Sequence, residues 1–197
     1  MLGLATVLGV SPGPALRVVS GGASSSRFEP AEVDGPLDFD SLFRRYAPYV
    51  GAIAIRILGC DEDVDDVVQD VFIQVHRGIG KVRDPSAVKA WLGCVAVRRA
   101  HRQLKRNWWR RLFCQREPAD YASLVDPGAS PEQRAEVMSA YRLLDTLPAR
   151  TRIVWVLRQV QGETLERIAE LCDCSLSTVQ RRLREAQSFM RTAGGHD

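Results

Sequence analysis

Residues 175–184, near the C-terminal end of the 197-residue sequence, are rich in polar and basic side chains. In a helix, Gln and Arg side chains can form bidentate hydrogen bonds to base edges, while Ser, Thr and further Arg side chains hold phosphates. The N-terminal half of such a helix fits the major groove of DNA. The stretch therefore predicts a DNA-contacting helix, with contacts from Ser175, Ser177, Thr178, Gln180, Arg181, Arg182 and Arg184.

Charge along the middle of the sequence is sharply divided, although the formal net charge is only +3. No acidic residue lies between Asp84 and Glu117, and the basic residues of that stretch are Lys89, Arg98, Arg99, Arg102, Lys105, Arg106, Arg110, Arg111 and Arg116. Just before it come the acids Asp61, Glu62, Asp63, Asp65, Asp66 and Asp70. Opposite charges on neighbouring segments indicate two partners of different charge.

The sequence lacks the residue groupings that catalysis requires. Its three histidines, His76, His101 and His196, are scattered, and the clustered carboxylates have no histidine partner. No glycine-rich phosphate-binding loop occurs. We therefore expect neither catalysis nor a small-molecule substrate, and no cofactor or metal site.

Five cysteines occur, at positions 60, 94, 114, 172 and 174, without a C-x-x-C pair. Cys172 and Cys174 are too close for a standard zinc knuckle, and no histidine lies near them. The odd number does not suit a disulfide framework, so we expect reduced, mostly packed thiols in a cytosolic protein. Oxidant sensing by Cys172 and Cys174 is a further hypothesis, motivated by their closeness in the sequence.

Residues 1–36 are rich in Gly, Ser, Pro and Ala, which predicts a disordered N-terminal extension. Its first ten residues are apolar, but they lack a basic n-region and are too short to span a bilayer. No other segment approaches transmembrane length. We therefore expect a soluble, cytoplasmic protein.

Apolar residues spaced three and four apart predict three helices in the domain of residues 37–114. A kink or a restart is expected at Pro48. Asp61 or Asp63 is expected to cap the second helix. The helices cover residues 38–58, 64–78 and, from Pro85 or Ser86, the stretch that ends near Trp108 and Trp109.

Residues 115–130 have little periodicity and contain the turn-forming run Asp126-Pro127-Gly128, which predicts a flexible linker. Ser130 and Pro131 then mark a helix start, with a cap residue followed by proline at the first helical position. The four helices predicted beyond this point cover about residues 131–147, 150–159, 165–171 and 175–190.

The last two of these helices predict a helix-turn-helix, with Thr164 and Ser175 as caps and a three-residue turn at 172–174. Asp173 stands where a left-handed residue is required, and Asp tolerates that conformation better than most residues. No alternating strand pattern occurs anywhere. The sequence therefore predicts an all-α chain of two small helical domains, residues 37–114 and 131–192, joined by the flexible linker.

Three motifs occur in order along the chain: DVVQDVF at Asp66–Phe72, AWL at 90–92 before the basic helix, and LPAR at 147–150 with GETLERIAE at 162–170 and STVQRRL at 177–183. The first resembles the D-x-x-Q-[DE]-x-F motif of the sigma-70 family of RNA polymerase sigma factors. The second resembles the family's minus-10 segment and the third its minus-35-reading domain. Two such domains separated only by a linker resemble the small extracytoplasmic-function (ECF, group IV) type.

This resemblance implies roles for individual residues. Asp66, Gln69 and Asp70 match positions that dock on the clamp helices of the largest polymerase subunit. The loop of residues 80–86, with Lys81 and Arg83, matches the segment that captures a flipped minus-10 base. The phosphates near that element would be held by Arg98, Arg99, Arg102, Lys105 and Arg106. The polar helix of residues 175–184 would read the minus-35 element.

The resemblance also bears on three tryptophans and on the turn of the helix-turn-helix. Trp91 is expected to pack in the core, whereas Trp108 and Trp109 either stack on unpaired bases or make an apolar contact to the linker or core. The turn Cys172-Asp173-Cys174 replaces a more usual Leu-Gly-Ile, so the angle of the recognition helix can differ. The N-terminal extension has no counterpart in the family pattern.

The function predicted from the resemblance is that of a sigma factor that binds core RNA polymerase and directs promoter-specific initiation. Core polymerase, promoter DNA and an inhibitory anti-sigma factor are the implied partners. The alternative is a stand-alone helix-turn-helix regulator with a helical sensor or dimerisation domain, which the C-terminal motif suits equally well. The first domain discriminates between them, because it shows an acidic docking face next to a basic helix rather than a pocket or a dimer seam.

Overall fold

The structure of the chain is a computed structural model that describes residues 39–78, 87–114, 121, 124–125 and 128–194. Within these ranges it holds α-helices and no strand, which confirms the all-α prediction. The helices are α1 Phe39–Leu58, α2 Val64–Gly78, α3 Val88–Cys114, α4 Pro131–Leu144, α5 Ala149–Gln159, α6 Leu165–Cys172 and α7 Leu176–Gly194. The expected N-terminal extension and the loop with Lys81 and Arg83 lie outside the described residues. Among the described residues, no helix has both the length and the apolar character needed to cross a membrane.

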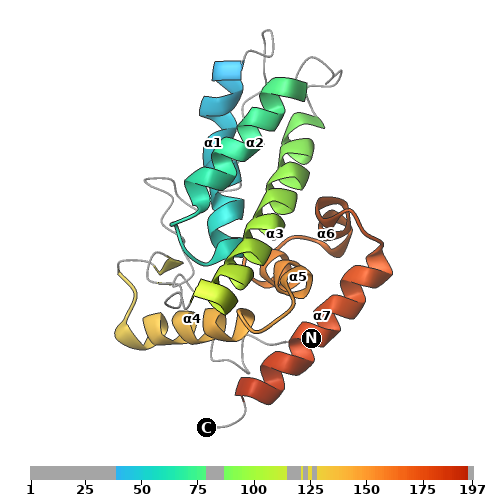
Figure 1. Cartoon of the computed structure of the whole chain (residues 1–197). Helices are drawn as coiled ribbons and strands as arrows, with labels where there is room; N and C mark the ends of the chain where they lie inside the picture. Colours follow the sequence, from blue (N-terminus) through green and yellow to red (C-terminus); the bar gives the residue numbers. More distant parts are fainter. Residues whose placement is uncertain (1–38, 79–86, 115–120, 122–123, 126–127, 195–197) are drawn as a thin grey trace.

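Helices α1, α2 and α3 lie side by side and bury their apolar stripes against one another (Figure 1). Side chains three and four residues apart share one face of a helix, so each stripe forms a continuous buried surface. Removing these faces from water is the main force that holds the three helices together. The buried residues of the first two helices include Leu42, Tyr46, Val50, Ile53, Ile57, Val67, Val71, Phe72 and Val75.

Several helix boundaries differ from the sequence prediction: α4 ends at Leu144 rather than near Leu147, and α7 extends to Gly194 rather than to about Met190. α1 continues through Pro48 as a single helix, so of the kink or restart expected there, the restart does not occur. α3 extends to Cys114, beyond the predicted end near Trp109. Arg110 and Arg111 in these added residues each pair with an aspartate of another segment, which stabilises the longer helix.

Asp63, one of the two predicted caps of α2, is buried and engaged with α3. Its carboxylate accepts a hydrogen bond from Asn107 Nδ2 at 2.7 Å and lies 3.8 Å from Arg110 Nη1. The side chain therefore ties the start of α2 to the C-terminal half of α3.

Side-chain caps define the starts of α4, α6 and α7 as predicted. Ser130 and Gln133 form a capping box at α4. Thr164 Oγ1 accepts a hydrogen bond at 3.1 Å from the amide three residues further on, and Ser175 Oγ does the same at 3.3 Å. Each of these bonds satisfies an amide that the first helical turn leaves unpaired.

The turn between α6 and α7 has the predicted backbone conformation. Asp173 has φ 51° and ψ 56°, in the left-handed region. The amide of Cys174 donates to the carbonyl of Ala169 at 3.0 Å and that of Asp173 to Glu170 at 3.2 Å, which closes the end of α6. The helix-turn-helix prediction is confirmed in its caps and in its turn.

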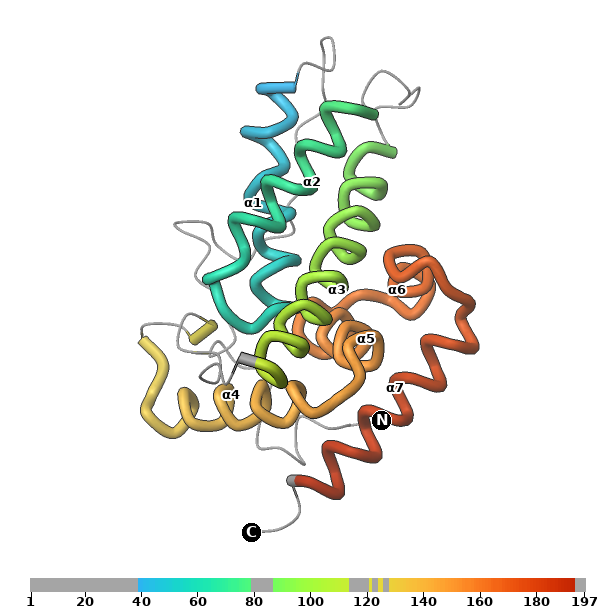
Figure 2. Tube along the Cα trace, viewed as in Figure 1, coloured from blue at the N-terminus to red at the C-terminus, as the bar shows by residue number. Residues whose placement is uncertain are grey.

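Helix α5 lies at the centre of the molecule, against α1 and α3 on one side and α6 and α7 on the other (Figure 2). The seven residues from Thr151 to Leu157 are all buried. Arg152 Nε donates to the carbonyl of Ile57 at 3.0 Å, and Arg152 Nη2 donates to that of Leu58 at 2.7 Å. A cation at the C-terminal end of α1 satisfies carbonyls that have no intrahelical partner.

The first three helices and the last four also meet where α6 lies on α3. Cys94 Sγ of α3 donates to the carbonyl of Glu170 at 3.4 Å. A Cβ atom at the neighbouring Gly93 would lie 2.8 Å from both Leu171 Cδ2 and Tyr49 Oη. The absence of a side chain at Gly93 therefore allows this close approach.

Part of the predicted linker is packed into the core. Tyr121, Leu124 and Val125 are buried. The Tyr121 ring packs 5.5 Å from that of Tyr141 in α4. A Cβ atom on Gly59, whose φ is +87°, would lie 2.7 Å from the Tyr121 ring, so glycine at the end of α1 accommodates it. The sequence prediction of a flexible linker missed these contacts.

Candidate nucleic-acid interface

The outer surface of α7 carries most of the side chains predicted to contact bases. Ser177, Gln180, Arg181 and Arg184 are exposed. The opposite side of the helix packs on α5 and buries Val179, Ala186 and Met190. The apolar anchor holds α7 in place, so its polar side faces solvent as a fixed surface.

Other members of the predicted α7 set are engaged within the protein. Ser175 caps the helix, and its Oγ lies 2.8 Å from Thr178 Oγ1. The half-buried Arg182 places Nη1 3.7 Å from Cys174 Sγ. Arg181 forms an ion pair with Glu185 on the next turn of the helix. Gln180 and Arg184 are exposed and take part in none of these contacts.

The long helix α3 carries the predicted minus-10 set. Arg98, Arg102, Lys105 and Arg106 are exposed, and Arg99 is half-buried. Residues three and four apart on a helix are neighbours, so these side chains form a basic stripe along α3. Lys81 and Arg83, the other two predicted members, lie outside the described residues.

The predicted docking residues of α2 face a groove that α3 closes on its other side. Asp66, Gln69 and Asp70 are exposed, as the sequence pattern indicates. The groove has a volume of about 360 Å³. Its lining from α3 consists of Arg99, Arg102, Gln103 and Arg106.

Two ion pairs cross this groove. Asp70 Oδ2 lies 3.2 Å from Arg99 Nη1, and Gln74 Oε1 accepts a hydrogen bond of 3.2 Å from Arg99 Nη2. Asp66 Oδ2 lies 3.7 Å from Arg106 Nη2. The sequence showed the acids and the bases as separate sets, whereas the structure places them face to face.

The pKa of His101, on α3, is lowered by burial and by the positive charges of the basic stripe and of neighbouring helices. Burial lowers the pKa of His101, and the positive charges of Arg150, Lys105, Arg182 and Arg102 lower it further. These cations come from α3, α5 and α7. His101 is therefore neutral at pH 7, and it lies in a region of positive potential to which both candidate DNA-binding helices contribute.

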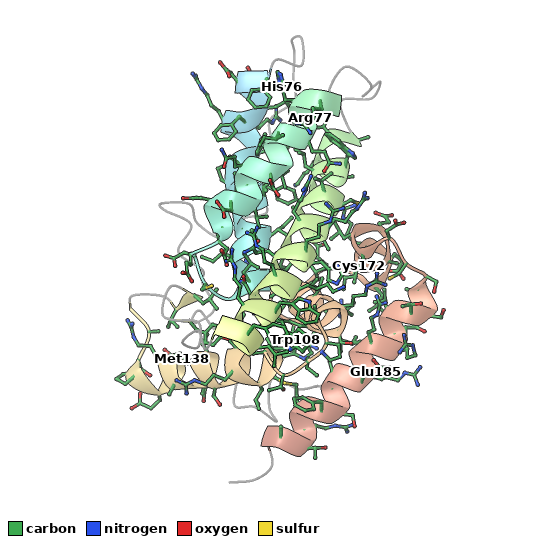
Figure 3. All side chains as sticks on the ribbon, viewed as in Figure 1. His76, Arg77, Trp108, Met138, Cys172 and Glu185 are labelled. Atoms are coloured by element: carbon green, nitrogen blue, oxygen red, sulfur yellow. The ribbon has the colours of Figure 1, made fainter. Side chains whose placement is uncertain are left out.

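Large apolar side chains are exposed at the C-terminal end of α3, where Figure 3 labels Trp108. Trp108 and Trp109 are each 51% exposed, so neither is packed in the core. The Trp109 ring stacks on Phe113, with centroids 5.4 Å apart and planes within 4°. The exposure excludes a position in the core, and both base stacking and a contact to the linker stay predictions. Trp91, by contrast, packs against the core as predicted.

The cysteines whose surroundings are described are free thiols: Cys60, Cys94, Cys172 and Cys174. Burial raises the pKa of Cys172 to about 12, and burial also raises the pKa of Cys94 and Cys60. A protonated thiol is a poor nucleophile. This disfavours the hypothesis that Cys172 senses oxidants.

A largely buried charge cluster around Asp145 was missed by the sequence analysis. Asp145 pairs with Arg152, lies 2.5 Å from Arg111 Nη1 and accepts a hydrogen bond from Tyr121. Burial and this hydrogen bond raise the pKa of Tyr121. The one local indication in the sequence is the position of Arg152 directly before the apolar run of residues 153–157. The cluster joins α3, α4, α5 and the linker.

Two families of known proteins match this chain in order. Residues 42–110 match Sigma-70 region 2, and residues 138–188 match Sigma-70, region 4. The first match covers α2 with most of α1 and α3. The second begins within α4 and includes the helix-turn-helix. Together they span more than half of the sequence.

Individual relatives extend the similarity to most of the chain. ECF RNA polymerase sigma factor SigM of Mycobacterium tuberculosis is 28% identical over 159 residues, which cover 80% of this chain and 78% of SigM. The ECF RNA polymerase sigma-E factor of Escherichia coli is 29% identical over 161 residues, covering 76% of this chain and 82% of sigma-E.

Solved structures show the same fold. The sigma factor RpoE in complex with the anti-sigma factor NepR from Bartonella quintana matches with a TM-score of 0.57 and 22% identity, over 81% of this chain and 98% of RpoE. CnrH in complex with the cytosolic domain of CnrY matches with a TM-score of 0.54 and 25% identity, over 81% of this chain and 88% of CnrH.

The helix-turn-helix beside a helix lined with arginines defines a DNA-binding protein of the transcription machinery. The chain belongs to the sigma-70 family, as an RNA polymerase sigma factor of the ECF type. Members of this family are non-enzymatic factors that direct transcription initiation.

Proposed function

We propose that this chain docks on core RNA polymerase through α2 and reads promoters through α3 and α7. Asp66, Gln69 and Asp70 supply the docking face. All three are exposed on one groove-lining side of α2. An acidic and polar face of this kind suits a basic partner helix, since complementary charge steers association and suppresses wrong partners.

The DNA contacts are divided between two helices. The basic stripe of α3, together with Lys81 and Arg83, holds phosphates and captured bases at the minus-10 element. The polar side of α7 reads the minus-35 element through Ser175, Ser177, Thr178, Gln180, Arg181, Arg182 and Arg184. Strand separation is favoured because the protein binds the unstacked strand better than the duplex, so binding energy replaces chemistry.

The observation that carries this proposal is that α7 is anchored on α5 with its polar side facing solvent. Ser175 caps its N-terminus, its apolar side is anchored on α5, and Gln180 and Arg184 face solvent in its N-terminal half. A recognition helix in the major groove needs this arrangement. A stand-alone regulator with a sensor domain is not favoured, because residues 42–110 match Sigma-70 region 2.

The proposed domains follow from the same assignment. Residues 37–114 form the polymerase-docking and minus-10 domain, and residues 131–192 form the minus-35 domain. Residues 115–130 connect them, and residues 1–36 are an extension. The chain works in the cytoplasm, where polymerase and promoter DNA are found, without catalytic activity of its own, and an anti-sigma factor is its inhibitory partner.

In vitro transcription with purified core polymerase and a library of promoters tests the proposal. We expect promoter-specific transcripts that require this protein. A triple substitution Asp66→Ala, Gln69→Ala and Asp70→Ala should abolish both the transcripts and co-purification with core polymerase. A double substitution Gln180→Ala and Arg184→Ala should leave core binding intact and remove promoter selectivity.

Matched controls come from exposed residues outside these surfaces. Asp61→Ala with Asp65→Ala removes two acids near the same helix, and Arg191→Ala removes a cation from the last turn of α7. Both should transcribe like the wild type. Sequence-specific DNA binding by the protein alone, with no polymerase-dependent initiation, would overturn the proposal in favour of the stand-alone regulator.

A further inference from the structure

The groove between α2 and α3 brings together side chains that the proposed function assigns to different partners. One side carries the docking residues, and the other carries three arginines of the minus-10 set. Asp70 and Arg99 approach to 3.2 Å, and Asp66 and Arg106 to 3.7 Å. A carboxylate beside an arginine weakens the attraction of that arginine for phosphate, and the arginine weakens the attraction of the carboxylate for a cationic partner.

We infer that the groove is one surface that two partners use in succession: Asp66 and Asp70 hold Arg106 and Arg99 in the free protein, and a basic helix that docks on α2 takes over the carboxylates and releases both arginines to bind DNA phosphates. The inference rests on the proposed function, because it takes α2 as the docking side and α3 as the DNA side. Polymerase docking and DNA binding then strengthen each other, since coupling between two sites is reciprocal.

The exposure of the two carboxylates supports an exchange of partners. The Asp66 side chain is 67% exposed and that of Asp70 is 57% exposed, so a partner helix reaches them without unfolding α2. Exposed ion pairs contribute little to stability, so their exchange costs little. The third aspartate between the same helices, Asp63, is buried and hydrogen-bonded to Asn107. It is fixed in place, and the exchange is confined to the two exposed pairs.

The geometry of Arg99 also supports the exchange. Its two terminal nitrogens are directed to α2 by Asp70 and Gln74, both at 3.2 Å. After the Asp70 carboxylate turns to a partner, Gln74 alone holds Arg99, and an uncharged amide leaves the positive charge of Arg99 available. Arg102, which lines the groove between these two pairs, adds a further cation to the released surface.

The test measures DNA affinity of the full-length free protein, without polymerase, by fluorescence anisotropy of a labelled 20-base-pair duplex over a salt titration. The groove variant Asp66→Asn with Asp70→Asn is compared with the control Asp61→Asn with Asp65→Asn. Both remove two negative charges from the same segment, but neither Asp61 nor Asp65 lines the groove. We expect the groove variant to bind about tenfold more tightly than the control. Its salt dependence should be steeper by about two units, as expected for two added phosphate contacts.

A second pair of variants identifies the released groups. Arg99→Gln with Arg106→Gln should weaken DNA binding only slightly in the wild-type background, where both arginines are occupied. The same change in the groove variant should remove its whole gain. Equal gains in the groove and control variants, or equal losses from the arginine changes in both backgrounds, would overturn the exchange.

Retention of the groove variant by immobilised core polymerase separates this inference from the proposed function. Loss of retention without a gain in DNA affinity over the control overturns the exchange and leaves the docking role standing. Unchanged retention overturns the docking role of α2, and with it the inference that a polymerase helix drives the exchange. Loss of retention together with a gain in DNA affinity supports both.

Discussion

Two of the places where the described residues pair aspartates with arginines differ in burial, and burial determines what each pair does. At Asp145 the partner Arg152 is 2% exposed and also binds the last carbonyls of α1. In the groove between α2 and α3, Asp66 and Asp70 are mostly exposed to water. The buried cluster holds the first three helices to the last four, whereas the groove keeps its charges accessible to partners.

The physical reason is the cost of leaving a charge without its partner. In water an unpaired charge is solvated, so an exposed ion pair adds only about 0–1 kcal/mol. In a buried site the remaining charge is largely shielded from water, and breaking the pair by removing one partner costs about 3–5 kcal/mol. The same two residue types are therefore a structural element in one place and an exchangeable contact in the other.

The largest effect predicted by this comparison is on the buried cluster. Replacing Arg152 with Ala should lower the free energy of unfolding by about 3–5 kcal/mol, because Asp145 and two carbonyls of α1 lose a buried donor. Urea denaturation followed by circular dichroism measures the change. The control Arg150→Ala removes an exposed arginine of the same helix and should change stability by less than about 0.5 kcal/mol.

In the same urea denaturation experiment, a substitution in the groove should have a much smaller effect. Arg106→Ala removes one member of an exposed pair and should change the free energy of unfolding by at most about 1 kcal/mol. Similar losses in the free energy of unfolding for Arg152→Ala and Arg106→Ala would show that burial does not separate the two regions.

Two glycines, Gly93 and Gly51, test how closely α6 packs on α3. A methyl group at Gly93 would lie 2.8 Å from Leu171 and Tyr49, and Leu171 is buried. The overlap costs about 1–3 kcal/mol, which outweighs the gain of about 0.5–1 kcal/mol from removing glycine from a helix. Gly93→Ala should therefore destabilise the protein in thermal denaturation.

Gly51 is the matched control, because it also lies within a helix and its nearest contact would be Val68 at an ordinary 3.9 Å. Gly51→Ala should be neutral or stabilising by up to about 1 kcal/mol. If both substitutions shift the melting temperature in the same direction, α6 does not pack on α3 as closely as described.

The exposed aromatic residues at the C-terminal end of α3 are a second accessible surface, like the groove. Replacing Trp108 and Trp109 with Ala should weaken binding of single-stranded oligothymidine by about thirtyfold or more, since two stacking rings are removed and each stacked base contributes about 1–3 kcal/mol. Duplex binding should change much less. The control Leu112→Ala removes an exposed aliphatic neighbour that cannot stack. An equal loss with Leu112→Ala would indicate a general apolar contact instead of base stacking.

The sequence predicted those features that depend on near neighbours. Helical periodicity, the caps at Thr164 and Ser175, and the left-handed Asp173 are all decided within a few residues, so local patterns predict them. The outward face of α2 follows from the same periodicity. The polar surface of α7 was predictable for this reason, because its members lie on one short helix.

Features that depend on how distant segments pack were not predictable in this way. Arg152 is a charged residue directly before an apolar run, and periodicity gives no reason for burying it. Its partners Asp145 and the carbonyls of α1 are fixed by the packing of α5 on α1. The pairing of Asp70 with Arg99 likewise depends on the relative position of α2 and α3, which their buried faces determine.

The smallest predicted effect concerns an exposed pair that the sequence does show. Arg181 and Glu185 lie one turn apart on α7, and a pair at this spacing contributes about 0.3–0.5 kcal/mol. Glu185→Gln should release Arg181 and raise DNA affinity about twofold, with no measurable change in core polymerase binding. Anisotropy with a promoter duplex measures the gain, and Glu166→Gln on α6 is the charge-matched control. A gain as large as that of the groove variant would show that general charge, rather than the placement of pairs across α2 and α3, controls the arginines of both helices.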